Sequence, residues 1–296
     1  MEDTKLYIVT GASGRTGKVA AQTLLQQGLQ VRVVLRNRQH SDYWQTLGAE
    51  VAIADYSDPD ARVLAFKGAH GAYIVSPPQY HSEQLFEQAQ AMADNIAHAA
   101  HSVQLDKLVV LSSVGAEQGH ATGWIRMNRM LEIKLANSGI AVTFLRAAYF
   151  RENWSPMLKQ AQDQQSLASF LTPAERELPL IATADIGRIA AEALCEDWQG
   201  IRILDLDGPQ PYSPNDVAQY ASRLLNKEIS VAEIPEKDWP AAIAGQGFSA
   251  AAIKGFTEMT CGLNSGHIAF KNDARIERRS GQITLQETIA ELLQPQ

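Results

Sequence analysis

Cysteine is scarce in this chain of 296 residues: there are only two, Cys195 and Cys261, far apart in the sequence. This argues against a disulfide framework and makes the cytoplasm the expected compartment. No apolar run approaches the roughly 20 residues that a membrane-spanning helix needs. The N-terminus also lacks the basic and apolar regions of a signal peptide. We therefore expect a cytoplasmic protein that does not enter a membrane.

Positive charge is also in short supply, because 26 Lys and Arg face 33 Asp and Glu, a net charge of -7. This balance argues against a broad nucleic-acid-binding face. Metal-ligand clusters are missing as well: His98 and His101 lie one helical turn apart, but no cysteine or carboxylate completes a set. We therefore expect no nucleic-acid partner and no metal. The 45% of apolar residues is enough for a sizeable core.

The first half of the chain alternates apolar runs, typical of buried parallel strands, with helical stretches. The predicted strands are 6–10, 31–35, 51–54, 72–75, 108–112 and 142–145, and the predicted helices are 15–27, 42–47, 58–66, 81–101 and 124–138. This alternation predicts an α/β fold with a doubly wound parallel sheet of the Rossmann type. The expected strand order is 3-2-1-4-5-6, with the ligand at the switch point between strands 1 and 4.

The pattern changes after Arg146. We therefore expect residues 1–150 to form a dinucleotide-binding domain, and residues 151–296 a smaller α+β substrate or partner lobe, parts of which return to the main sheet. Expected in that lobe are helices at 184–195, after 213 and at 284–293, and strands at 201–206 and 229–234. Thr183 is the expected N-cap of the first helix, and Ser213 that of the second.

A glycine-rich loop separates the first predicted strand from the first predicted helix. It reads Gly11-Ala12-Ser13-Gly14-Arg15-Thr16-Gly17, a G-x-x-G-x-x-G spacing. Gly11 permits a sharp turn, Gly14 lets the backbone approach a pyrophosphate, and Gly17 lets the helix pack close to the strand. The N–H groups at the helix start favour an anion, to which the hydroxyls of Ser13 and Thr16 can add hydrogen bonds. We therefore expect this loop to hold the pyrophosphate of a nicotinamide dinucleotide.

Arg36 follows the second predicted strand, where an NAD enzyme usually has an acidic residue for the ribose 2′-hydroxyl. A guanidinium group suits the 2′-phosphate of NADP(H) instead, and Arg15 and Arg38 are expected nearby. We therefore favour NADP(H) over NAD(H). The alternative is that these arginines are solvated loop charges.

Two further segments end strands at the same edge of the predicted sheet. Asp55 can accept a hydrogen bond from the adenine amino group, with Tyr56 beside the ring; the alternative for Asp55 is a helix cap, which Asp58 suits better. Ser76-Pro77-Pro78 has two residues without N–H donors. This segment is either a rigid wall beside the nicotinamide ribose or a plain turn.

Together these residues resemble the atypical short-chain dehydrogenase/reductase superfamily, in particular its NmrA-like group. The matching segments are 10–17, 54–59, 111–116 and 138–153, with a weaker match at 280–288. The resemblance implies an NADP-type cofactor along the glycine loop, Arg36, Asp55, Tyr56, Ser76, Pro77, Pro78 and the turn from Phe150 to Asn153. It also implies two uses for that cofactor. Some relatives are NADPH-dependent reductases of quinones or double bonds, and others are redox sensors that contact regulatory proteins.

The chain departs from the superfamily in one respect that matters for catalysis. Relatives with alcohol dehydrogenase activity carry Tyr-x-x-x-Lys on the helix after strand 5, where the lysine lowers the pKa of the tyrosine. No tyrosine precedes a lysine at that spacing here. Some NmrA-like proteins keep a lysine that meets the nicotinamide ribose, and alignment back from Gly139 puts Asn128 at that position. Ser113 occupies the place of a catalytic serine but, without its tyrosine, reads as a strand-end hydroxyl. We therefore assign no catalytic residue.

Hydride transfer to a quinone needs mainly stacking and alignment, because the cofactor supplies the reductant. Tyr149 and Trp154 are candidates to line a flat pocket for an aromatic acceptor, with lobe packing as the alternative. We therefore expect an NADPH-dependent reductase of a quinone or similar small electrophile. The alternatives are a non-catalytic NADP(H) sensor that binds a regulatory protein, and an isomerase or reductase of a biosynthetic pathway.

Overall fold

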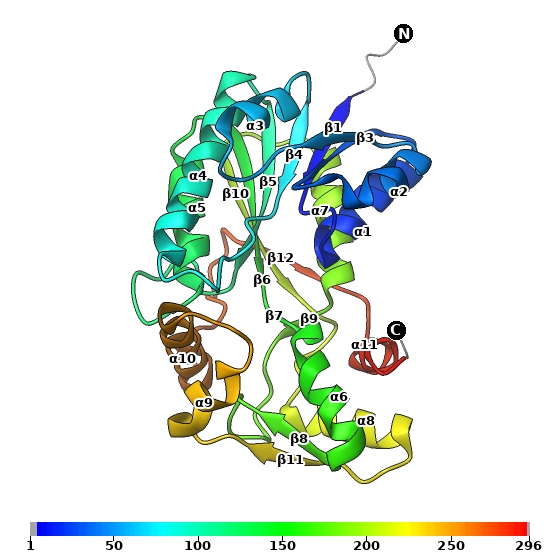
Figure 1. Cartoon of the computed structure of the whole chain (residues 1–296), viewed down its shortest axis with the longest axis vertical. Coiled ribbons are helices and arrows are strands. Elements are labelled where there is room, and N and C mark those ends of the chain that lie inside the picture. The colour runs from blue at the N-terminus through cyan, green and yellow to red at the C-terminus, as the bar shows by residue number, and fades with distance from the viewer. Residues whose placement is uncertain (1–4, 295–296) are drawn as a thin grey trace.

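A sheet of eight parallel strands forms the centre of the computed structural model, which describes residues 5–294 (Figure 1). The strand order is β12-β10-β6-β5-β4-β1-β2-β3, and every pairing is parallel. The strands are β1 (Leu6–Thr10), β2 (Gln30–Leu35), β3 (Glu50–Ile53), β4 (Gly71–Ile74), β5 (Lys107–Ser113), β6 (Ala141–Ala147), β10 (Ile201–Asp207) and β12 (Glu277–Ser280). The predicted doubly wound sheet and its order 3-2-1-4-5-6 are confirmed, and two strands from the second half extend it.

Helices cover both faces of the sheet, which explains why its strands are continuous apolar runs. Tyr7 and Val9 of β1 face one buried cluster together with α1 and α7, whereas Ile8 faces a second cluster under α3, α4 and α5. The covering helices are α1 (Arg15–Gln26), α2 (Ser41–Thr46), α3 (Pro59–Phe66), α4 (Leu85–Ser102), α5 (Ile125–Ala136) and α7 (Thr183–Cys195), and the short 3-10 turn η1 (Arg38–His40) precedes α2. The core of the sheet therefore uses residues from both halves of the chain.

A second lobe lies beyond the carboxyl ends of the central strands (Figure 1). Its two small parallel ribbons pair β7 (Tyr149–Phe150) with β9 (Leu180–Ile181), and β8 (Ser166–Ser169) with β11 (Ser230–Glu233). Its helical elements are η2 (Arg151–Trp154), α6 (Ser155–Gln164), α8 (Pro214–Leu225), η3 (Glu236–Asp238), α9 (Trp239–Ala244), α10 (Ala250–Ser265) and α11 (Leu285–Leu292). None of the helices described over residues 5–294 combines the length and apolarity of a membrane span.

The caps of three helices test the predicted boundaries. Asp58 accepts from the N–H of Ala61 at the start of α3, and Ser213 forms a capping box with Asp216 at the start of α8, as predicted. The prediction for Thr183 was wrong. This residue is already inside α7, and its hydroxyl donates to Glu152 instead of accepting from the helix backbone.

α10 was not predicted, because the two glycines inside it weaken its helical pattern. Both are needed for packing. A β-carbon at Gly255 would lie 2.7 Å from the indole of Trp124, and one at Gly262 would lie 2.8 Å from the carbonyl oxygen of Ala121. Tertiary contact with the segment that precedes α5 therefore outweighs local propensity in α10.

Candidate cofactor site

The three glycines after β1 each meet a different steric demand. Gly11 has a φ of +66°, and a β-carbon there would lie 3.0 Å from that of Val75. The N–H of Gly14 donates to the carbonyl oxygen of Gly11 at 2.8 Å, which closes the turn. A β-carbon at Gly17 would lie 2.3 Å from the same oxygen. Glycine is therefore required at Gly11 by its φ and at Gly17 by the close approach of α1 to the strand, whereas a β-carbon at Gly14 would lie 3.2 Å from the oxygen of Gly11.

The N-terminus of α1 has no capping side chain. Its N-cap residue, Gly14, makes no side-chain hydrogen bond, and the first turn of α1 has no acidic residue. Other helices, among them α4, α5 and α7, also lack a side-chain cap, so what distinguishes α1 is that its uncapped end directly follows β1 and the glycine loop. Open N–H groups at a positive helix end fit a pyrophosphate. Ser13 and Arg15 are exposed beside this end, whereas Thr16 is buried.

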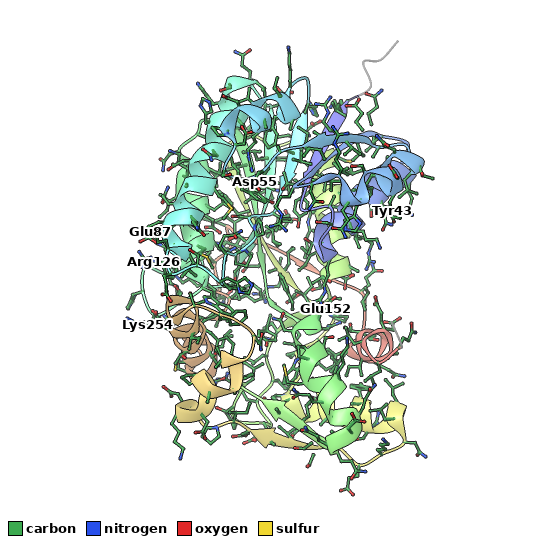
Figure 2. All side chains as sticks on the ribbon, in the orientation of Figure 1. Tyr43, Asp55, Glu87, Arg126, Glu152 and Lys254 are labelled. Carbon is green, nitrogen blue, oxygen red and sulfur yellow. The ribbon has the colours of Figure 1, made fainter. Side chains whose placement is uncertain are left out.

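Arg36 follows β2 and Asp55 follows β3, and the positive charge of Arg36 acts on the carboxylate of Asp55. Asp55 accepts from the hydroxyl of Ser57 at 2.6 Å and from its N–H at 2.9 Å, both on Oδ1. These hydrogen bonds, with a smaller contribution from Arg36 and Arg62, hold the pKa of Asp55 below its usual value. Asp55 is therefore an ionised acceptor with one oxygen already used, and Figure 2 labels it at this edge of the sheet.

Tyr56 joins the ends of β3 and β4. Its hydroxyl donates to the carbonyl oxygen of Val75 at 3.1 Å, and the guanidinium of Arg62 lies over its ring at 4.5 Å from the centroid. Burial raises the pKa of Tyr56 to about 12. Arg62 thus covers one face of the Tyr56 ring. That Tyr56 lies beside an adenine stays a prediction, and it applies to the opposite face of the ring.

The segment after β4 connects the candidate site to the second lobe. Ser76 and Pro77 are half-buried and Pro78 is exposed. Further along, the carboxylate of Glu83 accepts from the N–H groups of Ala250 and Ala251, at 2.8 and 3.1 Å, at the start of α10. The segment from Ser76 to Glu83 therefore holds α10 as well as bordering the glycine loop.

The turn after β6 leaves one acceptor oxygen open. Oε1 of Glu152 accepts from the N–H and the hydroxyl of Thr183, at 2.8 and 2.5 Å. Its Oε2 is buried and has no hydrogen-bond partner within residues 5–294. Glu152 lies between the sheet and the second lobe (Figure 2). Phe150 is half-buried and Asn153 is exposed, so this turn offers polar groups where a dinucleotide crossing the sheet edge would pass.

Tyr149 and Trp154, the two candidates to line an acceptor pocket, both contact the core of the second lobe. Trp154 is only 2% exposed and belongs to the core of the second lobe. Tyr149 packs against the same cluster, and burial raises its pKa to about 12. The lobe-packing alternative therefore holds for Trp154. Ser113 donates its hydroxyl to the carbonyl oxygen of Val114, as expected for a strand-end hydroxyl.

A buried charged network fixes α5 to the sheet. Ser112, Arg146 and Asp205 occupy adjacent positions on β5, β6 and β10. Glu132 of α5 accepts from the hydroxyl of Ser112 at 2.6 Å and takes two hydrogen bonds from Arg146, at 3.0 and 2.7 Å. Glu117 lies 3.4 Å from the same guanidinium. Since these groups are mostly buried, the network holds the helix in one position relative to the strand ends.

Asp205 makes stability depend on pH. Burial raises its pKa from 3.8 to about 6, against the opposing effect of Arg146 and Arg278. The folded state therefore binds the proton more tightly than the unfolded state, and this contribution to stability is lost as pH rises from about 4 to about 6. We expect Asp205→Asn to stabilise the protein by about 2 kcal/mol more at neutral pH than at about pH 4. Urea unfolding of both proteins at the two pH values measures this difference, and an equal effect at both would contradict it.

Known proteins resemble the chain over nearly its whole length. Quinone oxidoreductase 2 of Escherichia coli is 23% identical over 295 residues, which cover 97% of this chain and 98% of that protein. The photosystem II assembly factor Ycf39 of Cyanophora paradoxa is 22% identical over 230 residues, 77% of this chain and 71% of that protein.

Solved structures share the fold. An NADPH-dependent quinone oxidoreductase from Escherichia coli, complexed with NADPH, superposes with a TM-score of 0.80 at 21% identity, over 98% of this chain and 100% of that one. A triphenylmethane reductase from Citrobacter sp., complexed with NADP(H), gives a TM-score of 0.80 at 19% identity, over 98% and 100%. A sequence model of the NmrA-like family matches residues 3–265. The chain belongs to the NmrA-like family.

Proposed function

We propose that this protein binds NADP(H) and reduces a quinone or similar small electrophile by hydride transfer. The observation that carries the proposal is the uncapped N-terminus of α1 at the glycine loop, at the edge of the sheet where Arg36 follows β2. The relatives that bear on it are a quinone oxidoreductase and a triphenylmethane reductase, whose structures contain NADPH and NADP(H).

Each part of the site has a role in this proposal. The open N–H groups of the residues after Gly14 bind the pyrophosphate, and Arg36 binds the 2′-phosphate. The turn from Phe150 to Asn153 and the wall of Ser76 to Pro78 orient the nicotinamide end. When bound, the cofactor supplies the hydride, and the chain binds and aligns the acceptor.

A redox sensor that binds a regulatory protein is the second candidate function. The replacement of Tyr-x-x-x-Lys favours it, because the helix after β5 then lacks the usual acid of the superfamily. NADPH absorbance distinguishes the two functions. A reductase consumes NADPH when a quinone is added, whereas a sensor binds NADPH tightly and consumes none with any acceptor.

The cofactor preference depends on Arg36. A charge-assisted hydrogen bond contributes roughly 1.5–3 kcal/mol, so we expect NADPH to bind at least about tenfold more tightly than NADH. Arg36→Glu should reverse this order, because a carboxylate repels the 2′-phosphate and accepts from a 2′-hydroxyl. Calorimetric titration with both nucleotides measures it. The matched control is Arg223→Glu, an exposed charge on α8, and tighter binding of NADH by the unaltered protein would refute the preference.

A further inference from the structure

Three aromatic side chains from different segments form one cluster, which we call the aromatic wall: Tyr80, Trp124 and Phe248. The rings of Tyr80 and Trp124 are stacked, with centroids 3.9 Å apart and planes 25° apart. Phe248 lies 5.3 Å from Tyr80 and 5.7 Å from Trp124. All three are partly exposed, unlike Trp154 in the lobe core. Each ring therefore keeps only part of its surface exposed, because the three rings cover one another and Phe256 packs against Trp124.

The wall borders the candidate cofactor site. Tyr80 follows the Ser76–Pro78 segment after β4, and β4 pairs with β1, which carries the glycine loop. Trp124 immediately precedes α5, which follows β5, the next strand. In a doubly wound sheet the ligand lies outside the carboxyl ends of these strands, at the switch point. The wall thus stands where a hydride acceptor would meet the nicotinamide.

Trp124 also occupies a distinctive position in the sequence. Counting back from Gly139 puts Asn128 at the place of a lysine that some NmrA-like proteins keep, and Trp124 comes four residues earlier. Residues four apart lie on the same face of a helix. The residue one helical turn before Asn128 is thus a flat indole and not a phenol that could exchange a proton.

The indole is held rigidly and has no proton to offer an acceptor. Its Nε1–H donates to the carbonyl oxygen of Ala252 at 2.8 Å. Gly255 of α10 has no side chain and lets the indole ring approach the helix closely. Burial also raises the pKa of Tyr80 well above its usual range, so its phenol is a weaker acid than an ordinary tyrosine. What the wall supplies is therefore a preformed stacking surface and not an acid.

Resting on the proposed function, we propose that the aromatic wall is a specificity site that selects planar fused-ring quinones over single-ring quinones. A naphthoquinone accepts a hydride and becomes a hydroquinone monoanion, which takes one proton from water, while NADPH becomes NADP⁺. No protein acid is required, which agrees with the lack of Tyr-x-x-x-Lys spacing in the sequence around α5. Trp124 contacts the second ring of the acceptor by stacking.

The test compares a methylated naphthoquinone with the matching methylated benzoquinone. We expect Trp124→Leu to lower kcat/KM about tenfold for the naphthoquinone, mainly through KM, and less than about threefold for the benzoquinone. Phe248→Leu should act in the same direction, and it leaves the bond between Trp124 and Ala252 in place. The matched control is Phe86→Leu on α4, a partly exposed ring outside the wall that packs against Arg126. NADPH affinity and thermal unfolding should match those of the unaltered protein in the control and in Phe248→Leu.

A second measurement separates this inference from the proposed function. A redox-inert naphthol is titrated calorimetrically into the NADP⁺-saturated protein, where we expect binding that weakens about tenfold in Trp124→Leu. If the unaltered protein reduces both quinones equally well, or if Trp124→Leu affects both equally, the reductase stands and the wall proposal is wrong. If no quinone is reduced, the reductase proposal is wrong and naphthol binding alone decides: selective binding supports the wall, and none overturns it.

Discussion

Glu132→Ala is expected to lower the free energy of unfolding by about 3 kcal/mol, because it removes two hydrogen bonds from a buried guanidinium and leaves it only Glu117, at 3.4 Å. Arg146 is 7% exposed and gives two hydrogen bonds to Glu132. A guanidinium keeps its charge in proteins, so Arg146 stays charged when the carboxylate is removed. Urea unfolding at neutral pH measures the loss.

The matched control lies on the same helix. Lys134 pairs with Asp94 at 2.6 Å, but the two side chains are 42% and 47% exposed. An exposed pair contributes about 0–1 kcal/mol, so Lys134→Ala should change stability little. Equal losses for the two variants would show that burial of the Glu132 pair does not determine its contribution.

Gly17→Ala is expected to weaken dinucleotide binding by roughly 30- to 100-fold and to destabilise the fold by about 1–3 kcal/mol. The new methyl group would lie 2.3 Å from the carbonyl oxygen of Gly11 and 2.8 Å from that of Thr10. Both oxygens belong to backbone that cannot rotate away, so α1 must shift from β1. That shift moves the N–H groups that would bind the pyrophosphate, and calorimetry with NADPH measures the effect.

Gly119→Ala is the control for this substitution. A β-carbon at Gly119 would meet no heavy atom within 4 Å, and its φ does not require glycine. We expect unchanged binding and a stability change within about 0.5 kcal/mol. If Gly17→Ala bound NADPH as well as Gly119→Ala does, the close approach of α1 to β1 would not matter for the cofactor.

The first six strands were predictable because each is a continuous apolar run followed by a helical pattern. The glycine loop was predictable because its spacing and its place between strand and helix meet local steric demands. β12 was not predictable, since its sequence Glu-Arg-Arg-Ser is polar and becomes a strand only by pairing with β10 at the sheet edge. Its pairing depends on a partner about 70 residues earlier in the chain.

The candidate site was predictable only in part, because the environment of a side chain depends on distant segments. Trp154 and Trp124 are the same residue type near strand ends, yet the first is in a core and the second is partly exposed. The aromatic wall joins residues as far apart as Tyr80 and Phe248. For Asp55 the sequence indicated an acceptor, but the hydrogen bonds from Ser57 appear only in three dimensions.

The contact between α1 and α7 has a consequence for how the protein can be divided or recombined. Gly187 of α7 is so close to α1 that a β-carbon there would lie 2.6 Å from the carbonyl oxygen of Thr16. α1, which follows the glycine loop, therefore packs between β1 of the first half and α7 of the second half. A fragment ending at residue 150 would lack α7 and would expose the side of α1 that packs against it. The first half of the chain can therefore be transferred to another protein only together with α7.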